Sequence, residues 1–384
     1  MSESNDVNLE LIRVRHLLHA HPEVSRQENA TSKYIQCYLR KNATPDSIVK
    51  LDGAAFAAVY EGVDSGKTIM FRTELDALPI HETNENLLYR SKRDGVGHKC
   101  GHDGHMAIMI GLGKRFATMR PYRGRVVLLF QHDEETGTGA RACCEHPNFE
   151  KIRPDFAFAL HNFPGFPLHQ IICRNGVIMS AVRCISISLY GKESHSAMPE
   201  TGISPAYALS EITLKAREIQ FEFDEATNRS LIVPVHTQMG VPSSGVMPGS
   251  GQITLTFRSE RNEVIEEMIR ELIGYAKKVS NQYGLTIEIE TIEEFFATKN
   301  DPEAVSMITS AAKGQGVDFR TLDKPFRAGE DFGEITSRYK GAMFGVGAGI
   351  NTPELHHPDY DFPDAIVSTG IGMFVELSEQ FLSQ

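Results

Sequence analysis

The sequence has no long hydrophobic run. Its longest uninterrupted apolar stretch, residues 54–60, is far shorter than the ~20 residues that a membrane-spanning helix needs. The first residues carry acidic side chains ahead of any basic one and contain no apolar core, so we expect no secretory signal there. These absences predict a protein without a membrane partner that works in the cytoplasm.

Basic residues are also in short supply. The chain has 39 Lys and Arg against 50 Asp and Glu, which gives a formal net charge of −11. Binding to a phosphate backbone requires clustered Lys and Arg side chains. We therefore do not expect nucleic acid as a partner.

Cysteines are few and irregularly spaced. They are Cys37, Cys100, Cys143, Cys144, Cys173 and Cys184. This spacing does not form a disulfide framework, and the adjacent pair at 143 and 144 favours a reducing compartment. A cysteine with a special role is therefore expected to act chemically and not as a crosslink.

The sequence contains neither an internal repeat nor a low-complexity tract, and its 384 residues suggest two domains. Hydrophobic residues make up 41% of the chain, as in ordinary globular proteins. Short apolar segments at 68–72, 125–131, 156–160 and 342–346 read as strands, and residues 105–120 have helical spacing. This alternation is typical of an α/β fold with crossover helices.

The pattern changes at about residue 179. Predicted strands lie at 183–190, 230–236, 252–258 and 286–292, and predicted helices lie at 205–220 and 262–283. The resulting βαββαβ order is that of a ferredoxin-like α+β domain. Because α/β features return after residue 295, we expect a domain at 179–292 inserted between residues 1–178 and 293–384 of a larger domain.

Metal-binding or carboxylate side chains follow the ends of all four strands predicted in the larger domain. In strand order they are Glu74 and Asp76, Glu134 and Glu135, His161, and His356 and His357. The carboxyl ends of such strands are where functional groups collect in open α/β sheets. The segment at 99–105 adds Cys100, His102 and His105. The sequence therefore predicts one cluster of ligands at one edge of the sheet.

A thiolate, imidazoles and carboxylates together favour zinc or a neighbouring transition metal over calcium or magnesium. If Glu135 binds the metal, Glu134 lies beside the activated water and can act as a general base. Taken singly, paired glutamates, a Cys-Gly-His segment or a histidine at a strand end are more often structural. It is their combination that predicts a metal site, and His105 and His357 are expected to be structural.

Eight segments resemble those of a known family. They are RHLLHAHPEVSRQE (15–28), ELDALPI (74–80), HKCGHDGHMA (98–107), QHDEETGTGA (131–140), HN (161–162), GKESHSAMPE (191–200), AGEDF (328–332) and LHHPDYDF (355–362). In this order they resemble the aminoacylase, hippurate hydrolase and auxin-conjugate amidohydrolase family of dinuclear metallopeptidases. The resemblance spans nearly the whole chain, and the CGHDGH block with the paired glutamates is its most specific part.

The resemblance implies an α/β catalytic domain with a mixed sheet flanked by helices, which binds two divalent metal ions, zinc or manganese. It also implies that the inserted ferredoxin-like domain is a lid that forms a homodimer. The ligands implied are Cys100, which bridges both ions, and His102, Glu135, His161 and His356.

Four further roles come from the same resemblance. Glu134 falls on the general base, and His195 on a lid histidine that stabilises the oxyanion, typically in the partner subunit's site. Asp76 falls on a carboxylate that steers a ligand or the base, and Arg258 on a lid arginine that faces the cleft and can hold a substrate carboxylate. The expected reaction is hydrolysis of an N-acyl amino acid or related small conjugate by a metal-activated water.

The chain departs from the family pattern at four places, none of which is a predicted ligand. Thr73-Glu74 replaces Ala-Asp, His132-Asp133 replaces Pro-Ala, and Glu193-Ser194 replaces Gly-Gly. Residues 245–248, Gly-Val-Met-Pro, replace Asn-Val-Ile-Pro. These changes leave the acyl group and the amino acid of the substrate open.

Three alternative functions remain at this point. A metallo-dipeptidase or carboxypeptidase would use the same chemistry on peptides. A cysteine hydrolase with Cys100 activated by His102 would not need Glu134, Glu135 or His161. A metal-binding descendant without turnover would be expected to have lost the base, whereas Glu134 is present.

Overall fold

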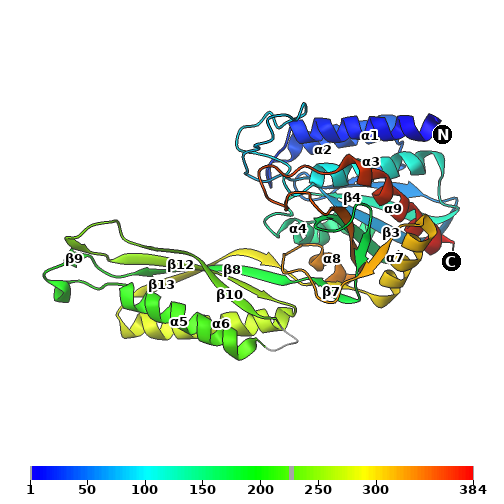
Figure 1. Cartoon of the computed structure of the whole chain (residues 1–384). Helices are drawn as coiled ribbons and strands as arrows, with labels where there is room; N and C mark the ends of the chain where they lie inside the picture. The colour runs from blue at the N-terminus through cyan, green and yellow to red at the C-terminus, as the bar shows by residue number, and fades with distance from the viewer. Residues whose placement is uncertain (1, 225–228, 384) are drawn as a thin grey trace. The chain divides into compact units, whose positions relative to one another are not determined.

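The computed structural model describes residues 2–224 and 229–383, with side chains described from residue 9 onward. In these ranges the chain forms two compact units, shown in Figure 1. The larger unit contains residues 2–178, 298–324 and 331–383. The smaller unit contains residues 179–224, 229–297 and 325–330.

The smaller unit extends to residue 297 and not to 292 as predicted, because strand β13 (Thr286–Phe295) pairs with β8 (Ala181–Tyr190) as far as Phe295. Residues 325–330 also belong to this unit. There the carbonyl of Phe326 accepts a hydrogen bond of 3.0 Å from the amide of Ser180. The chain therefore returns to the smaller unit after the larger one has resumed.

The larger unit is built on an eight-stranded sheet. Its strands, from one edge to the other, are β1 (Ser47–Lys50), β2 (Phe56–Glu61), β4 (Arg123–Gln131), β3 (Asp64–Glu74), β5 (Phe156–Pro164), β16 (Lys340–Gly349), β6 (Ile171–Cys173) and β15 (Phe319–Thr321). The four central strands are parallel, whereas β2 and β6 run antiparallel to β4 and β16. The predicted mixed sheet is confirmed.

Helices flank this sheet (Figure 1). They are α1 (Ser2–Ala20), α2 (Asn29–Asn42), α3 (His102–Thr118), α4 (Gly139–Glu145), α7 (Pro302–Gln315), α8 (Gly333–Arg338) and α9 (Val367–Leu382). A short pair, β7 (Gly176–Met179) with β14 (Thr298–Asn300), lies beside them, and 3-10 turns cover Pro147–Ile152 and Asp364–Ile366. None of the described helices is both long and apolar enough to cross a bilayer.

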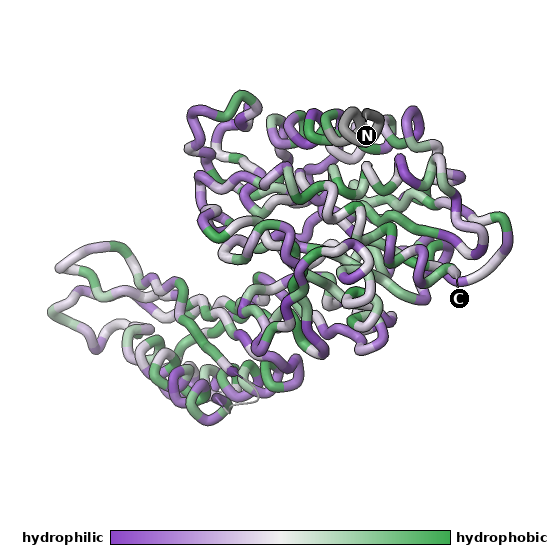
Figure 2. Tube along the Cα trace, turned by 45° about the vertical axis from the view of Figure 1, so that its right-hand side comes forward, coloured by the Kyte–Doolittle hydropathy of each residue, from purple (hydrophilic) through white to green (hydrophobic). Residues whose placement is uncertain are grey.

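The central strands are nearly continuous apolar runs because helices cover the sheet. Every residue of β5 is buried, and α3 is buried along most of its length. Helix α3 packs against α1, α9 and strand β3. Figure 2 shows hydrophobic residues along the central strands and hydrophilic residues in the loops around them. This packed core supports the sheet edge at which the site residues collect.

The smaller unit has a four-stranded antiparallel sheet in the order β10 (Leu231–Met239), β12 (Ser250–Ser259), β8 and β13. Helices α5 (Ala206–Phe223) and α6 (Asn262–Gln282) pack side by side against it (Figure 1). The unit also contains a pair of two-residue strands, β9 (Ser194–His195) and β11 (Val246–Met247), and a 3-10 turn, Pro199–Thr201. The chain order β8-α5-β10-β12-α6-β13 confirms the predicted βαββαβ arrangement.

Candidate metal centre

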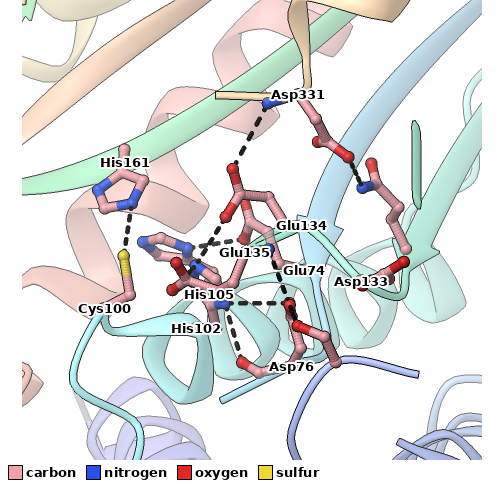
Figure 3. Close-up of polar contacts among 12 residues, drawn as sticks. Glu74, Asp76, Cys100, His102, His105, Asp133, Glu134, Glu135, His161 and Asp331 are labelled. Atoms are coloured by element: carbon pink, nitrogen blue, oxygen red, sulfur yellow. Dashed lines mark hydrogen bonds and ion pairs between the residues drawn. The ribbon is translucent and has the colours of Figure 1, made fainter. Parts of the chain in front are cut away.

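The four central strands bring their carboxyl ends to one edge of the sheet. Asp76 follows β3, the pair Glu134 and Glu135 follows β4, and His161 lies on β5. Figure 3 shows these side chains gathered with Cys100 and His102, which lie at the start of α3. The predicted ligands from separate strands therefore meet in one place.

Helix α3 begins at His102, three residues before the predicted start. The preceding residue, Gly101, has φ of +93°, and a Cβ there would lie 2.5 Å from the side-chain oxygen of Asn162. Both facts require glycine at this turn. The turn separates Cys100 from His102 and directs both side chains into the cluster (Figure 3).

His161 lies inside a strand and not beyond its end as predicted, because β5 continues to Pro164. Its Nδ1 donates to the carbonyl of Asn162 at 2.9 Å, and its Nε2 faces Cys100 Sγ at 3.4 Å. Burial, with a smaller contribution from His105, lowers the pKa of His161 to about 3. The ring is therefore neutral, the form in which imidazole binds metal.

His102 is fixed from one side and faces carboxylates on the other. Its Nδ1 donates to the carbonyl of Asp76 at 2.9 Å, while its Nε2 lies 3.9 Å from Glu135 Oε1 and 4.0 Å from Glu134 Oε2. Burial lowers the pKa of His102, but the surrounding carboxylates outweigh burial and raise this pKa to about 10. The pocket around His102 thus favours positive charge.

The same excess of negative charge shifts the pKa of the Cys100 thiol. Burial, followed by the carboxylates of Glu135, Glu134 and Glu74, raises the pKa of Cys100 well above its usual value. Without a cation the thiol stays protonated, which makes it a poor nucleophile. A bound cation would reverse this preference, because coordination deprotonates a thiol.

His356 completes the set from the loop after β16. Its Nε2 lies 3.6 Å from Glu135 Oε2, and its backbone amide donates to the carbonyl of Lys99 at 2.8 Å. The residue has φ of +67°, so this loop bends sharply where the histidine is presented. Its side chain is half exposed, which places it on the open side of the cluster.

The described residues contain five groups of possible metal ligands, and two of these groups consist only of predicted ligands. Cys100, His102 and His161 form one group, and Cys100, Glu135 and His356 form the other. Within each group the ligand atoms lie within 4.8 Å of one another. All five predicted ligands are included, and Cys100 is the member that the two groups share.

Glu134 and Asp76 hold the remaining positions near the cluster. Glu134 is buried, and its Oε1 accepts a hydrogen bond of 3.4 Å from the backbone amide of Asp331. Asp76 Oδ2 accepts the backbone amide of Glu135 at 2.9 Å. Asp76 therefore contacts both the His102 ligand, through its carbonyl, and the turn that carries the paired glutamates.

A buried polar network behind the cluster was not predicted. Arg72 is ion-paired with Glu74 and with Asp331, whose carboxylate also accepts the amide of Ala140 at 2.8 Å. Asp331 lies in the AGEDF segment (328–332), which resembles the family, but the sequence did not predict a role for it. His105, expected to be structural, bonds through Nδ1 to Glu74 at 2.8 Å.

The two lid residues of the prediction lie in the smaller unit. His195, on β9, is exposed, and its Nδ1 accepts the amide of Ala197 at 3.0 Å. Arg258, on β12, is half-buried and donates from Nη1 to the carbonyl of Arg327 at 2.5 Å. Burial lowers the pKa of Arg258, and Glu293 opposes that effect.

Known proteins are similar to this chain in sequence and in fold. The family described as peptidase family M20/M25/M40 matches residues 70–380. N-acetyldiaminopimelate deacetylase of Lactobacillus acidophilus is 28% identical over 369 residues, 94% of this chain and 95% of the relative. The same enzyme of Exiguobacterium sibiricum is 30% identical over 353 residues, 90% and 92% of the two chains.

A solved structure agrees with these matches. The Bacillus subtilis YXEP protein, described as a dinuclear metal binding peptidase from the M20 family, has a TM-score of 0.82 and 26% identity over 99% of both chains. The fold and the buried ligand cluster define a hydrolase of amide bonds. The chain belongs to peptidase family M20/M25/M40.

Proposed function

We propose that this chain is a dinuclear metal-dependent amidohydrolase that cleaves the amide of N-acyl amino acids or related small conjugates. The observation that carries the proposal is the pair of overlapping ligand groups that share Cys100. Similar proteins are named deacetylases of an N-acetylated amino acid, and one similar structure is described as a dinuclear metal binding peptidase.

The residues of the cluster fit two divalent cations. His102 Nε2 is buried and has no hydrogen-bond partner among the described residues, and the pKa shifts of His102 and Cys100 both reflect surplus negative charge. One cation would be held by Cys100, His102 and His161, the other by Cys100, Glu135 and His356. This mixture of sulfur, nitrogen and oxygen ligands suits zinc or manganese. When bound, such ions lower the pKa of water and polarise the substrate carbonyl.

Glu134 is the general base in this proposal. It takes the proton of the attacking water as the new C–O bond forms, and passes this proton to the leaving amine as the scissile C–N bond then breaks. Its burial and the Asp331 amide restrict the carboxylate to one position. Asp76 positions the adjoining residue through the Glu135 amide and supports His102.

His195 is the proposed donor to the oxyanion. Because the Ala197 amide donates to its Nδ1, the neutral ring carries its hydrogen on Nε2 and can donate it to developing negative charge. Arg258 is the proposed partner of a substrate carboxylate next to the amide. A guanidinium suits this role through two parallel hydrogen bonds.

We also propose a homodimer through the smaller unit, with His195 acting in the partner's site. The edge strand β10 has no Lys, Arg, Asp or Glu and is exposed from Val233 to Met239, with Pro234 and a register shift only in its first half. The opposite edge β13 carries four glutamates. An uncharged edge can pair with another strand, and an acidic edge resists pairing. Val235→Lys on β10 should yield monomers by analytical ultracentrifugation, whereas Ile292→Lys on β13, similarly exposed, should not.

The alternatives can be separated by their products. A metallo-dipeptidase or carboxypeptidase would prefer peptides, while a cysteine hydrolase is disfavoured by the raised pKa of Cys100. A descendant without turnover would cleave nothing. The free thiols of all six cysteines suit the proposed cytoplasmic location.

The test is a substrate panel with protein loaded with zinc or manganese. N-acetyl and N-benzoyl amino acids and unblocked dipeptides should be compared by kcat/KM, with products identified by mass spectrometry. Faster cleavage of the acyl amino acids supports the proposal. Preference for dipeptides would replace it with the peptidase alternative, and no cleavage by fully metal-loaded protein would contradict it.

A further inference from the structure

The segment that follows α1 contacts the turn that carries the paired glutamates. We propose that Ser25, Arg26 and Glu28, here called the N-terminal clasp, are positioning residues that hold the general base in its productive place. The inference rests on the proposed role of Glu134. All three residues precede the range 70–380 that the family model matches, and they lie in the segment 15–28, which resembles the family.

The turn begins with an unfavourable backbone conformation. Asp133 has φ of +56°, in the left-handed region that a non-glycine residue seldom adopts. Its amide donates to Glu28 Oε1 at 2.8 Å, and the same oxygen accepts the amide of Arg26 at 3.0 Å. Glu28 is fully buried. A buried carboxyl group thus holds the backbone one residue before Glu134.

Arg26 holds the side chain of the same residue. Its Nε donates to Asp133 Oδ2 at 2.9 Å, and its Nη2 donates to Thr138 Oγ1 at 3.1 Å. Thr136 Oγ1 donates to Asp133 Oδ1 at 2.6 Å from within the turn. Asp133 is one of the positions at which this chain departs from the family pattern. The Arg26 contact therefore depends on a carboxylate at a position where the family pattern described above has alanine.

Ser25 acts on the other side of the base. Its hydroxyl donates to Asp76 Oδ2 at 2.8 Å, and that oxygen also accepts the amide of Glu135 at 2.9 Å. The residues on both sides of Glu134 are therefore restrained, one directly by the clasp and the other through Asp76. A displacement of about 1 Å in a reacting group can cost ~10²-fold in rate, so these restraints bear on turnover.

The test uses full-length, metal-loaded protein and four variants. Arg26 has φ of +66°, which asparagine tolerates, so Arg26→Asn removes only the exposed guanidinium. Glu28→Ala removes the acceptor. Glu28→Gln keeps an oxygen that can accept both amides. Asp155→Ala is the matched control, because Asp155 accepts the Thr68 amide at 2.7 Å near the start of the parallel part of β3, away from the turn.

We expect kcat to fall roughly 10-fold in Arg26→Asn and roughly 100-fold in Glu28→Ala, with KM within about threefold and metal content unchanged. Glu28→Gln should restore kcat to near the natural value, and Asp155→Ala should keep it. Metal content by mass spectrometry and Tm distinguish lost positioning from lost metal or lost folding.

Natural kcat in both Arg26→Asn and Glu28→Ala would show that the clasp is only structural, and failure of Glu28→Gln to restore kcat would contradict the acceptor role. If Glu28→Ala does not fold, Arg26→Asn decides alone. Glu134→Gln is measured alongside. Full activity in that variant would refute the proposed function, whereas its loss together with fully active clasp variants would refute the clasp alone.

Discussion

The two units hold their predicted site residues in different ways. In the larger unit, His102 and His161 are buried, and each has one ring nitrogen fixed by a backbone carbonyl. In the smaller unit, His195 is exposed on a two-residue strand. The buried histidines are preorganised for binding cations. The exposed His195 is accessible to a substrate or a partner subunit.

Metal removal should have the largest effect, and only on the larger unit. Chelation should abolish activity, a loss of at least ~10³-fold, and added zinc or manganese should restore it. Hydrogen exchange should increase around Cys100 and Glu135, because the clustered carboxylates lose their counter-charge, and remain unchanged in β8 and β12. Chelated protein that still turned over through an acyl-Cys100 adduct would contradict the account.

His195→Ala should lower kcat by ~10²- to 10³-fold, the usual cost of losing one donor to an oxyanion. Its metal content should stay unchanged, since no ligand is touched. Mixing it with Glu134→Gln should restore activity if the histidine acts in the partner's site, because one complete site then forms per heterodimer. Inactive, verified heterodimers would place the histidine's action within its own chain.

Arg258→Ala should have a smaller and selective effect. A charged hydrogen bond of ~1.5–3 kcal/mol corresponds to at least tenfold in kcat/KM for an N-acyl amino acid, and its C-terminal amide should be unaffected. Arg183→Ala is the control, because Arg183 lies on the neighbouring strand and pairs with Glu294. Equal kcat/KM for acid and amide in the natural protein would remove the carboxylate requirement.

The smallest effect concerns pH and stability. Burial raises the pKa of Glu28 from 4.5 to about 7, with hydrogen bonds from the Asp133 and Arg26 amides opposing burial and Asp76 adding to it. The folded state therefore resists ionisation, and stability is lost as pH rises from about 4.5 through about 7.

Glutamine does not ionise, so Glu28→Gln does not suffer this loss. The Tm of the variant minus the Tm of the natural protein should therefore be roughly 2–4 °C larger at pH 8 than at pH 5. Glu290→Gln on β13 makes the same change at an exposed glutamate and is the control. A Tm difference for Glu28→Gln that did not change with pH would contradict the raised pKa.

Much of the fold follows from local sequence pattern. The apolar runs predicted the central strands, and the four chain segments that end beside Asp76, Glu134, His161 and His356 converge as parallel strands require. The start of α3 was misplaced because glycine at positions 101 and 104 weakens the helical pattern there, although the left-handed turn at Gly101 makes His102 the first helical residue.

The supporting contacts could not be predicted, because they join distant parts of the chain. Arg72 pairs with Asp331 across 259 positions, and Glu28 meets the Asp133 amide across 105. Neither periodicity nor strand ends indicate such partners. Paired ligands that follow strands are therefore readable from sequence, whereas the residues that hold them in place need the structure.

Glu134→Gln tests the central claim most directly. The variant should bind zinc or manganese with the stoichiometry of the natural protein, because the ligands Cys100, His102 and Glu135 are intact. It should lose ~10²- to 10⁴-fold in kcat on the best N-acyl amino acid of the panel, because an amide side chain cannot accept the proton. Near-natural kcat in the fully metal-loaded variant would contradict the account.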